Sequence, residues 1–68
     1  MPIKVRLDER MKASGLSLTE LSQRVGITLA NLSILKTGKA RAVRFSTLEA
    51  LCETLGCQPG DLLVFEKE

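Results

Sequence analysis

Basic side chains without acidic neighbours mark the middle of this 68-residue chain. Positions 21–48 contain no Asp or Glu, and their basic residues are Arg24, Lys36, Lys39, Arg41 and Arg44. Elsewhere acidic residues outnumber basic ones, so the net charge of +2 hides one strongly basic segment. Guanidinium and ammonium groups gathered in this way bind polyanions, and for a small domain that polyanion is most often nucleic acid.

The residue types that most enzymes and metal centres require are missing. The chain has no His, which removes the commonest general base. Cys52 and Cys57 are too few for a structural zinc site, and nothing basic adjoins Cys57 in sequence to activate a thiolate. Both cysteines are therefore interpreted as small apolar residues in a reducing compartment. No Gly-rich phosphate loop with a lysine is present, so we expect no enzyme, no metal, no cofactor and no small-molecule ligand.

Capping residues predict where the helices that carry the basic segment begin. Ser17 followed by Glu20 forms a capping box, in which each side chain satisfies a free backbone N–H of the first turn. Thr28 is the expected cap of the next helix, and Ser46 with Glu49 resembles a second capping box. Glycines mark most of the helix ends. The helices are expected at about 7–14, 18–25, 29–37 and 47–55, with a short final turn at 59–61.

The spacing around Gly26 predicts a helix-turn-helix. Glycine supplies the tight turn, Ile27 fills the corner, and the small Ser22 lies where two helices cross steeply. The remaining inward positions are apolar at helical spacing: Leu18, Leu21, Val25, Leu32 and Leu35. Few other arrangements require all of these residues together.

Both ends of the chain have the character of short strands. Ile3, Val5 and Leu7 alternate with polar residues, which is the period of a strand. The segment 62–65 is a candidate partner strand. The fold class expected is all-α, with five short helices and a small two-stranded sheet from the terminal segments. Such a sheet would either close the core of the monomer or make a dimer contact.

Residues 15–57 resemble the helix-turn-helix domain of Cro/cI-type phage repressors, the XRE family, and in particular its short single-domain members. The resemblance rests on LTELSQRVGIT from Leu18, NLS from Asn31, KTGK from Lys36, RFSTLEALC from Arg44 and LGCQPGDLL from Leu55. It implies a lambda-repressor-like fold, one domain over residues 1–68, and a helix-turn-helix core at about 18–37.

In that family the third helix, here about 28–37, enters the major groove of DNA. The resemblance implies that base edges or the groove floor are met by Thr28, Leu29, Ala30, Ser33 and Ile34. The resemblance and the charge pattern together place phosphates near Ser17, Asn31, Lys36, Lys39, Arg41 and Arg44.

The chain departs from the family where many members carry Gln or Arg, because Leu18, Leu29 and Ala30 are all apolar. Apolar side chains cannot form bidentate hydrogen bonds to bases, although they can pack on thymine methyl groups. We therefore expect T-rich half-sites, or weak base readout helped by DNA shape.

The function expected is a sequence-specific double-stranded DNA-binding transcriptional regulator, a repressor, acting as a cytoplasmic homodimer without membrane contact. The alternative is a protein-binding module, such as an antitoxin or an adaptor, that uses the apolar face of the third helix.

Overall fold

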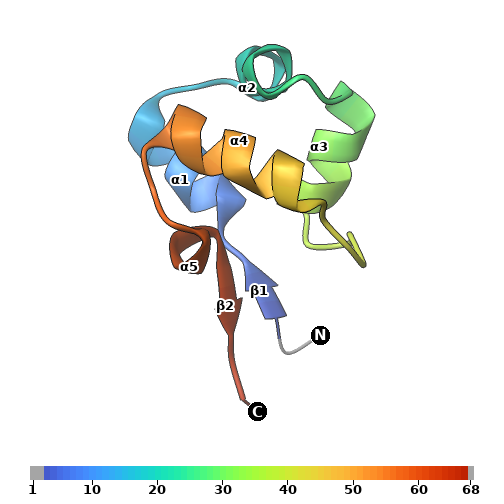
Figure 1. Ribbon diagram of the computed structural model, residues 1–68, viewed down its shortest axis with the longest axis vertical. Coiled ribbons are helices and arrows are strands. Elements are labelled where there is room, and N and C mark those ends of the chain that lie inside the picture. Colours follow the sequence, from blue (N-terminus) through green and yellow to red (C-terminus); the bar gives the residue numbers. More distant parts are fainter. Residues whose placement is uncertain (1–2, 68) are drawn as a thin grey trace.

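Five short helices and a two-stranded sheet make up the computed structural model, which describes residues 3–67 (Figure 1). The elements in chain order are β1 (Ile3–Val5), α1 (Leu7–Ser14), α2 (Leu18–Val25), α3 (Leu29–Lys36), α4 (Phe45–Leu55), α5 (Pro59–Leu62) and β2 (Leu63–Phe65). The strands pair antiparallel, with Ile3 opposite Phe65 and Val5 opposite Leu63. The predicted helical fold with a small terminal sheet is confirmed.

The helix-turn-helix formed by α2 and α3 has the predicted caps. The Ser17 hydroxyl accepts a hydrogen bond from the Glu20 N–H at 3.1 Å, and the Glu20 carboxylate accepts one from the Ser17 N–H at 3.4 Å. Gly26 ends α2 with φ of 81°, a left-handed conformation that side chains disfavour. The Thr28 hydroxyl then caps α3 by accepting from the Asn31 N–H at 3.1 Å. These caps fix where the two helices meet.

The prediction that Ser46 caps the fourth helix is wrong. The N-cap is Arg44, whose carbonyl accepts the Leu48 N–H at 2.9 Å, and α4 begins at Phe45. Ser46 therefore lies inside the first turn, and no side chain caps this helix. The third helix also ends slightly earlier than predicted, because Thr37 is its C-cap.

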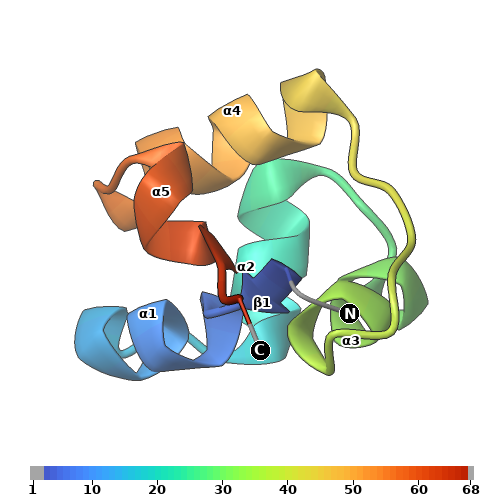
Figure 2. The same ribbon diagram turned by 90° about the horizontal axis from the view of Figure 1, so that it is seen from below.

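A single leucine-rich core joins all five helices. Its buried side chains are Leu7, Met11, Leu21, Leu32, Leu35, Leu51 and Leu62. Seen from the sheet end, α4 lies across from α1 and α3, and this core fills the space between them (Figure 2). Ser22 is buried where α2 packs inward, and its hydroxyl donates to the Thr19 carbonyl at 2.8 Å. The small side chain predicted at this helix crossing is thus present, and its hydroxyl group is hydrogen-bonded.

Two carboxylates of the surface link helices that are distant in sequence. Asp8 of α1 lies 3.4 Å from the Lys12 ammonium and 3.5 Å from that of Lys36 at the end of α3. Asp61 of α5 lies 3.1 Å from the Arg10 guanidinium. Partial burial raises the pKa of Asp8, but Lys12 and Lys36 outweigh it, and the net effect is a lowered pKa. No helix formed by residues 3–67 combines the length and the apolar character needed to cross a bilayer.

Candidate nucleic-acid interface

The N-cap and the outward face of α3 carry the five side chains predicted to meet DNA bases. Thr28, Leu29, Ala30 and Ile34 are exposed, and Ser33 is half-buried. Leu29 and Ile34 are each 47% exposed, so two large apolar side chains face solvent on a helix that also supplies the core. Helix α3 is thus apolar toward the core and largely apolar toward solvent, with hydroxyl groups between.

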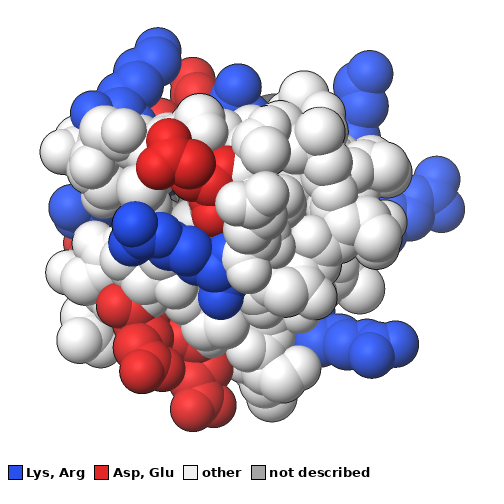
Figure 3. Space-filling view, turned by 90° about the horizontal axis from the view of Figure 1, so that it is seen from above, with Lys and Arg blue, Asp and Glu red and all other residues white. Residues whose placement is uncertain are grey.

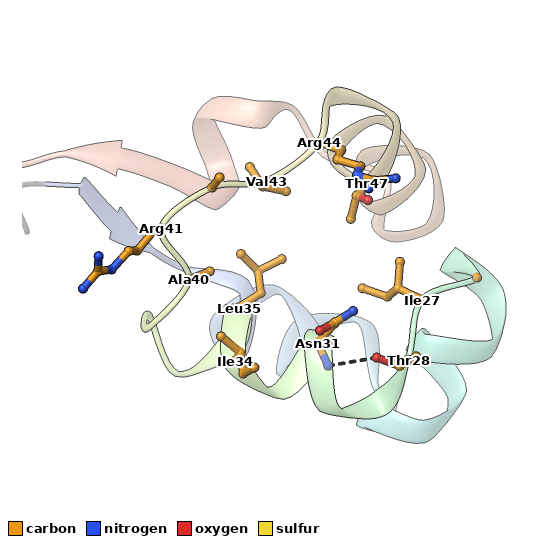
Figure 4. Close-up of a pocket in the computed structure, with 12 residues that line it drawn as sticks. Ile27, Thr28, Asn31, Ile34, Leu35, Ala40, Arg41, Val43, Arg44 and Thr47 are labelled. Atoms are coloured by element: carbon orange, nitrogen blue, oxygen red, sulfur yellow. Dashed lines mark hydrogen bonds between the residues drawn. The ribbon is translucent and has the colours of Figure 1, made fainter.

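A surface hollow of about 560 Å³ lies between α3, the loop that follows it and the start of α4 (Figure 4). Apolar side chains such as Ile27, Leu35 and Val43 line part of it. Asn31 and Thr47 extend toward one another from opposite sides, and Arg41 points outward from the loop (Figure 4). Polar groups therefore surround a partly apolar hollow beside the outward face of α3.

The predicted phosphate contacts differ in how free their charges are. Lys39, Arg41 and Arg44 are exposed, and no carboxylate in the described chain lies within ion-pair distance of them. Lys36 is partly covered and pairs with Asp8. On the face drawn in Figure 3, basic side chains alone occupy the side where α3 and its following loop lie, and acidic ones gather on the other side. The fold therefore segregates charge in space as the sequence does along the chain.

Ser17 and Asn31 occupy the first turns of the two helices. The Ser17 hydroxyl already donates to Glu20 at 3.1 Å, so a phosphate would have to displace this bond. The Asn31 amide has no such role in the described structure, because only its backbone N–H is used by the α3 cap. Asn31 is thus the freer polar group of the two.

Sequence reasoning missed two features of this surface. Asp8 has no signal in the local pattern, because its pairing with Lys36 depends on how α1 packs against α3. Thr47 carries no functional signal in the local sequence pattern, yet it lines the hollow together with Asn31. Its place two residues into α4 became apparent only once the start of that helix was known.

An exposed second helix of a helix-turn-helix, flanked by cations that have no ion-pair partner in residues 3–67, is typical of a DNA-binding protein of the helix-turn-helix class. Residues 6–68 match the model of the Cro/C1-type HTH DNA-binding domain, and the chain belongs to this family. It is accordingly a helix-turn-helix DNA-binding transcriptional regulator and not an enzyme, as its sequence predicts.

Known proteins of similar sequence and structure agree with this assignment. The chain is 56% identical, over all 68 residues and 81% of the relative, to the uncharacterized HTH-type transcriptional regulator YozG of Bacillus subtilis (strain 168). Its fold is similar to that of the SinR protein/SinI protein complex, with a TM-score of 0.75 and 24% identity. That match covers 81% of this chain and 53%, about half, of the other.

A second structural neighbour is the master regulator for biofilm formation SinR in complex with DNA, with a TM-score of 0.74. The identity is 24%, and the match covers 79% of this chain and 86% of the other. At this identity the two structures are evidence for the fold, and the residue roles on this chain have to be argued from its own surface.

Proposed function

We propose that this protein is a repressor that recognises a specific double-stranded DNA sequence as a homodimer, with α3 of each subunit in the major groove. One observation carries the proposal: the outward face of α3 is exposed and lies beside three basic side chains that have no ion-pair partner in residues 3–67. Two-fold related half-sites would then lie roughly 34 Å apart, one turn of DNA. A bacterial regulator of this kind acts in the cytoplasm, where its DNA is.

The proposed contacts divide into those that read bases and those that hold phosphates. The base-facing set is Thr28, Leu29, Ala30, Ser33 and Ile34. The phosphate-facing set is Ser17, Asn31, Lys36, Lys39, Arg41 and Arg44. Among the latter, Lys39, Arg41 and Arg44 contribute most to affinity, because the charge of Lys36 is shared with Asp8.

Sequence preference would come from the apolar side chains of α3. Leu29 and Ala30 have no donor or acceptor, so they can distinguish a base only through the thymine methyl group. The hydroxyls of Thr28 and Ser33 add hydrogen bonds that suit more than one base. The half-sites are therefore expected to be rich in thymine, with DNA shape contributing at positions that no side chain reaches.

Selection of bound sequences from a random duplex pool, followed by titration at several salt concentrations, tests the proposal. A single symmetric site should emerge, and affinity should fall steeply between about 50 and 200 mM salt. Lys39→Glu with Arg41→Glu should abolish retention at physiological salt. Arg6→Glu with Arg10→Glu, the same change in net charge at two residues that lie beside α5 and outside the proposed contact set, should retain most of the binding.

Transcription in vitro from a promoter that carries the selected site tests the repressor role, which requires that added protein lowers transcript yield. An increase in yield would show an activator instead.

The exposure of Leu29 and Ile34 also favours a second function, a protein-binding module such as an antitoxin or an adaptor. The two functions make opposite predictions about salt. The protein-binding module would be favoured if the affinity for DNA did not change between low and high salt and random fragments were not retained.

A further inference from the structure

Cys52 and Cys57 lie on either side of the C-terminal end of α4 and take no part in the proposed DNA contacts. Gly56, with φ of 65°, ends this helix in the left-handed conformation. The Cys52 carbonyl accepts the N–H of Gly56 and also that of Cys57, the latter at 3.0 Å. A bond from the residue after the left-handed glycine back to the last turn of the helix is the signature of the Schellman motif.

The Schellman motif also determines which side chains meet. The residue that follows the left-handed glycine commonly packs its side chain on the residue whose carbonyl it contacts. In this chain both of these residues are cysteines, Cys57 and Cys52. Both thiols are free and half-buried, and both side chains pack against the core. The end of α4 therefore holds two thiols beside each other, with part of each open to a small reagent in solvent.

The protonation of Cys57 reflects the same contact. Burial raises the pKa of the Cys57 thiol most, and the charge of Cys52 raises it further. The Arg10 guanidinium lowers this pKa, whereas Asp61 and a hydrogen bond with the Cys52 side chain raise it, and the net result lies above the ordinary value of 9.0. An ionised Cys52 therefore keeps Cys57 protonated, and Cys52 is the thiol that reacts first, because the thiolate is the nucleophile.

We propose that Cys52 and Cys57 are a modification site at which oxidised glutathione produces a reversible intramolecular disulfide. The Cys52 thiolate attacks one sulfur of glutathione disulfide, which forms a mixed disulfide and releases one glutathione thiolate. Cys57 then loses its proton to solvent, and its thiolate attacks the Cys52 sulfur and releases the second glutathione. Two protein thiols are oxidised and one glutathione disulfide is reduced, and the two protons pass through solvent to the released thiolates.

The disulfide joins the end of α4 to the segment that leads into α5. Cys57 directly precedes Gln58, the N-cap of α5, whose N–H donates to the Asp61 carboxylate at 2.9 Å. The hollow beside α3 lies at the opposite end of α4 (Figures 1 and 2), so the modification is independent of the proposed DNA contacts. In a reducing cytoplasm the dithiol is the resting form, and the disulfide forms when the glutathione pool becomes oxidised.

Mass spectrometry of the native protein after incubation with oxidised glutathione tests the site. The expected product is a single chain that has lost two hydrogens and has no thiol left for iodoacetamide to alkylate, and dithiothreitol should restore both thiols. Cys52→Ser and Cys57→Ser should each stop at a mixed disulfide with one glutathione, because the second thiol is missing. A wild-type chain that carries two glutathiones, keeps both thiols or forms disulfide-linked dimers would overturn the proposal.

Two cysteines this close in sequence can also pair in an unfolded chain, so a shifted pair is the matched control. Cys57→Ser with Gln58→Cys moves the second thiol by one residue, away from the position that the Schellman motif sets against Cys52. In one glutathione buffer the native shifted variant should close about tenfold less disulfide than the native wild type, because disulfide geometry is specific. In urea the two proteins should close it about equally, since their loops have nearly the same length. Equal closure by the two native proteins would overturn the role of the fold.

Thermal melts of the reduced and oxidised wild type test whether the native turn accommodates the bond. The oxidised protein should melt slightly higher, because the disulfide constrains the unfolded chain and closes only a short loop. A lower melting temperature of the oxidised protein would show that the thiols must leave their native positions to react, which contradicts the proposal.

Discussion

Leu29 and Ala30 stand where a DNA-reading helix usually presents hydrogen-bonding side chains, and they limit what this helix can recognise. If they contact thymine methyl groups, replacing thymine by uracil at those positions of the selected site removes the contact and nothing else. Each lost methyl contact should cost about 0.8 kcal/mol, about a fourfold loss of affinity in a fluorescence anisotropy titration. Uracil at thymines outside the half-sites is the control. Unchanged affinity at every position would assign the preference to DNA shape.

Asp8 limits the contribution of Lys36, since the two groups lie 3.5 Å apart. Asp8→Asn should leave the Lys36 ammonium free for a phosphate, raise DNA affinity, and steepen the dependence of log K on log salt by about 0.9. Glu9→Gln removes the same charge from the neighbouring position, where the carboxylate faces Arg6, and it should leave the salt slope unchanged. Equal slopes for the two variants would show that Asp8 does not limit the contact of Lys36 with a phosphate.

At the scale of elements, the turn between α2 and α3 depends on a residue that adopts positive φ. Gly26→Ala should destabilise the protein by about 1–2 kcal/mol, because φ there is 81° although space for a methyl group is open. Gly60→Ala also meets open space, but at an ordinary φ inside α5, and it should be neutral or slightly stabilising. Urea denaturation of both variants measures the difference, and equal destabilisation would contradict the conformational explanation.

The same local chemistry explains which elements the sequence could predict. Ser17 with Glu20, and Gly26 at its left-handed φ, act within one turn of the backbone, so the bounds of α2 follow from the sequence alone. Ser46 with Glu49 has the same spacing, yet α4 begins at Phe45 without a side-chain cap. A capping pattern permits a start but does not enforce one when the preceding segment can also adopt helical geometry.

The candidate site was predictable to the extent that it lies on one element. The outward residues of α3 follow from helical spacing once Leu32 and Leu35 are assigned to the core. The pairing of Lys36 with Asp8 and the hollow shared with Thr47 depend on contacts between distant segments. No periodicity in the chain carries that information, so these features had to come from the structure.

For the molecule as a whole, charge is distributed so that one side is left uncompensated. The ion pairs of the described residues all involve α1, and three of the four lie within it or join it to α3 or α5. The loop after α3 has basic residues and no such pairs. The charged side chains around α1 thus form ion pairs with one another, and the remaining positive charge lies where a polyanion can approach α3.

The ion pairs around α1 make stability depend on pH at the acid end. The backbone N–H of Gln58 is the largest influence that lowers the pKa of Asp61; partial burial opposes it, and Arg10, 3.1 Å away, adds to the lowering. A carboxyl group whose pKa falls on folding stabilises the protein above its ordinary value of 3.8, and this contribution is lost as pH falls through the folded-state pKa. The melting temperature should therefore fall below about pH 4 as this contribution is lost.

Asp61→Asn should lower the melting temperature at neutral pH, because the stabilising carboxylate is absent. It should also flatten the fall of the melting temperature in acid, because no carboxylate remains at this position to be protonated. Glu53→Gln, at an exposed position of α4 outside the ion pairs of residues 3–67, should reproduce the wild-type acid profile. Thermal melts from pH 2.5 to 7 by circular dichroism make the comparison over about the range in which carboxyl groups titrate. An Asp61→Asn profile parallel to that of the wild type would show that the link between α1 and α5 does not control acid unfolding.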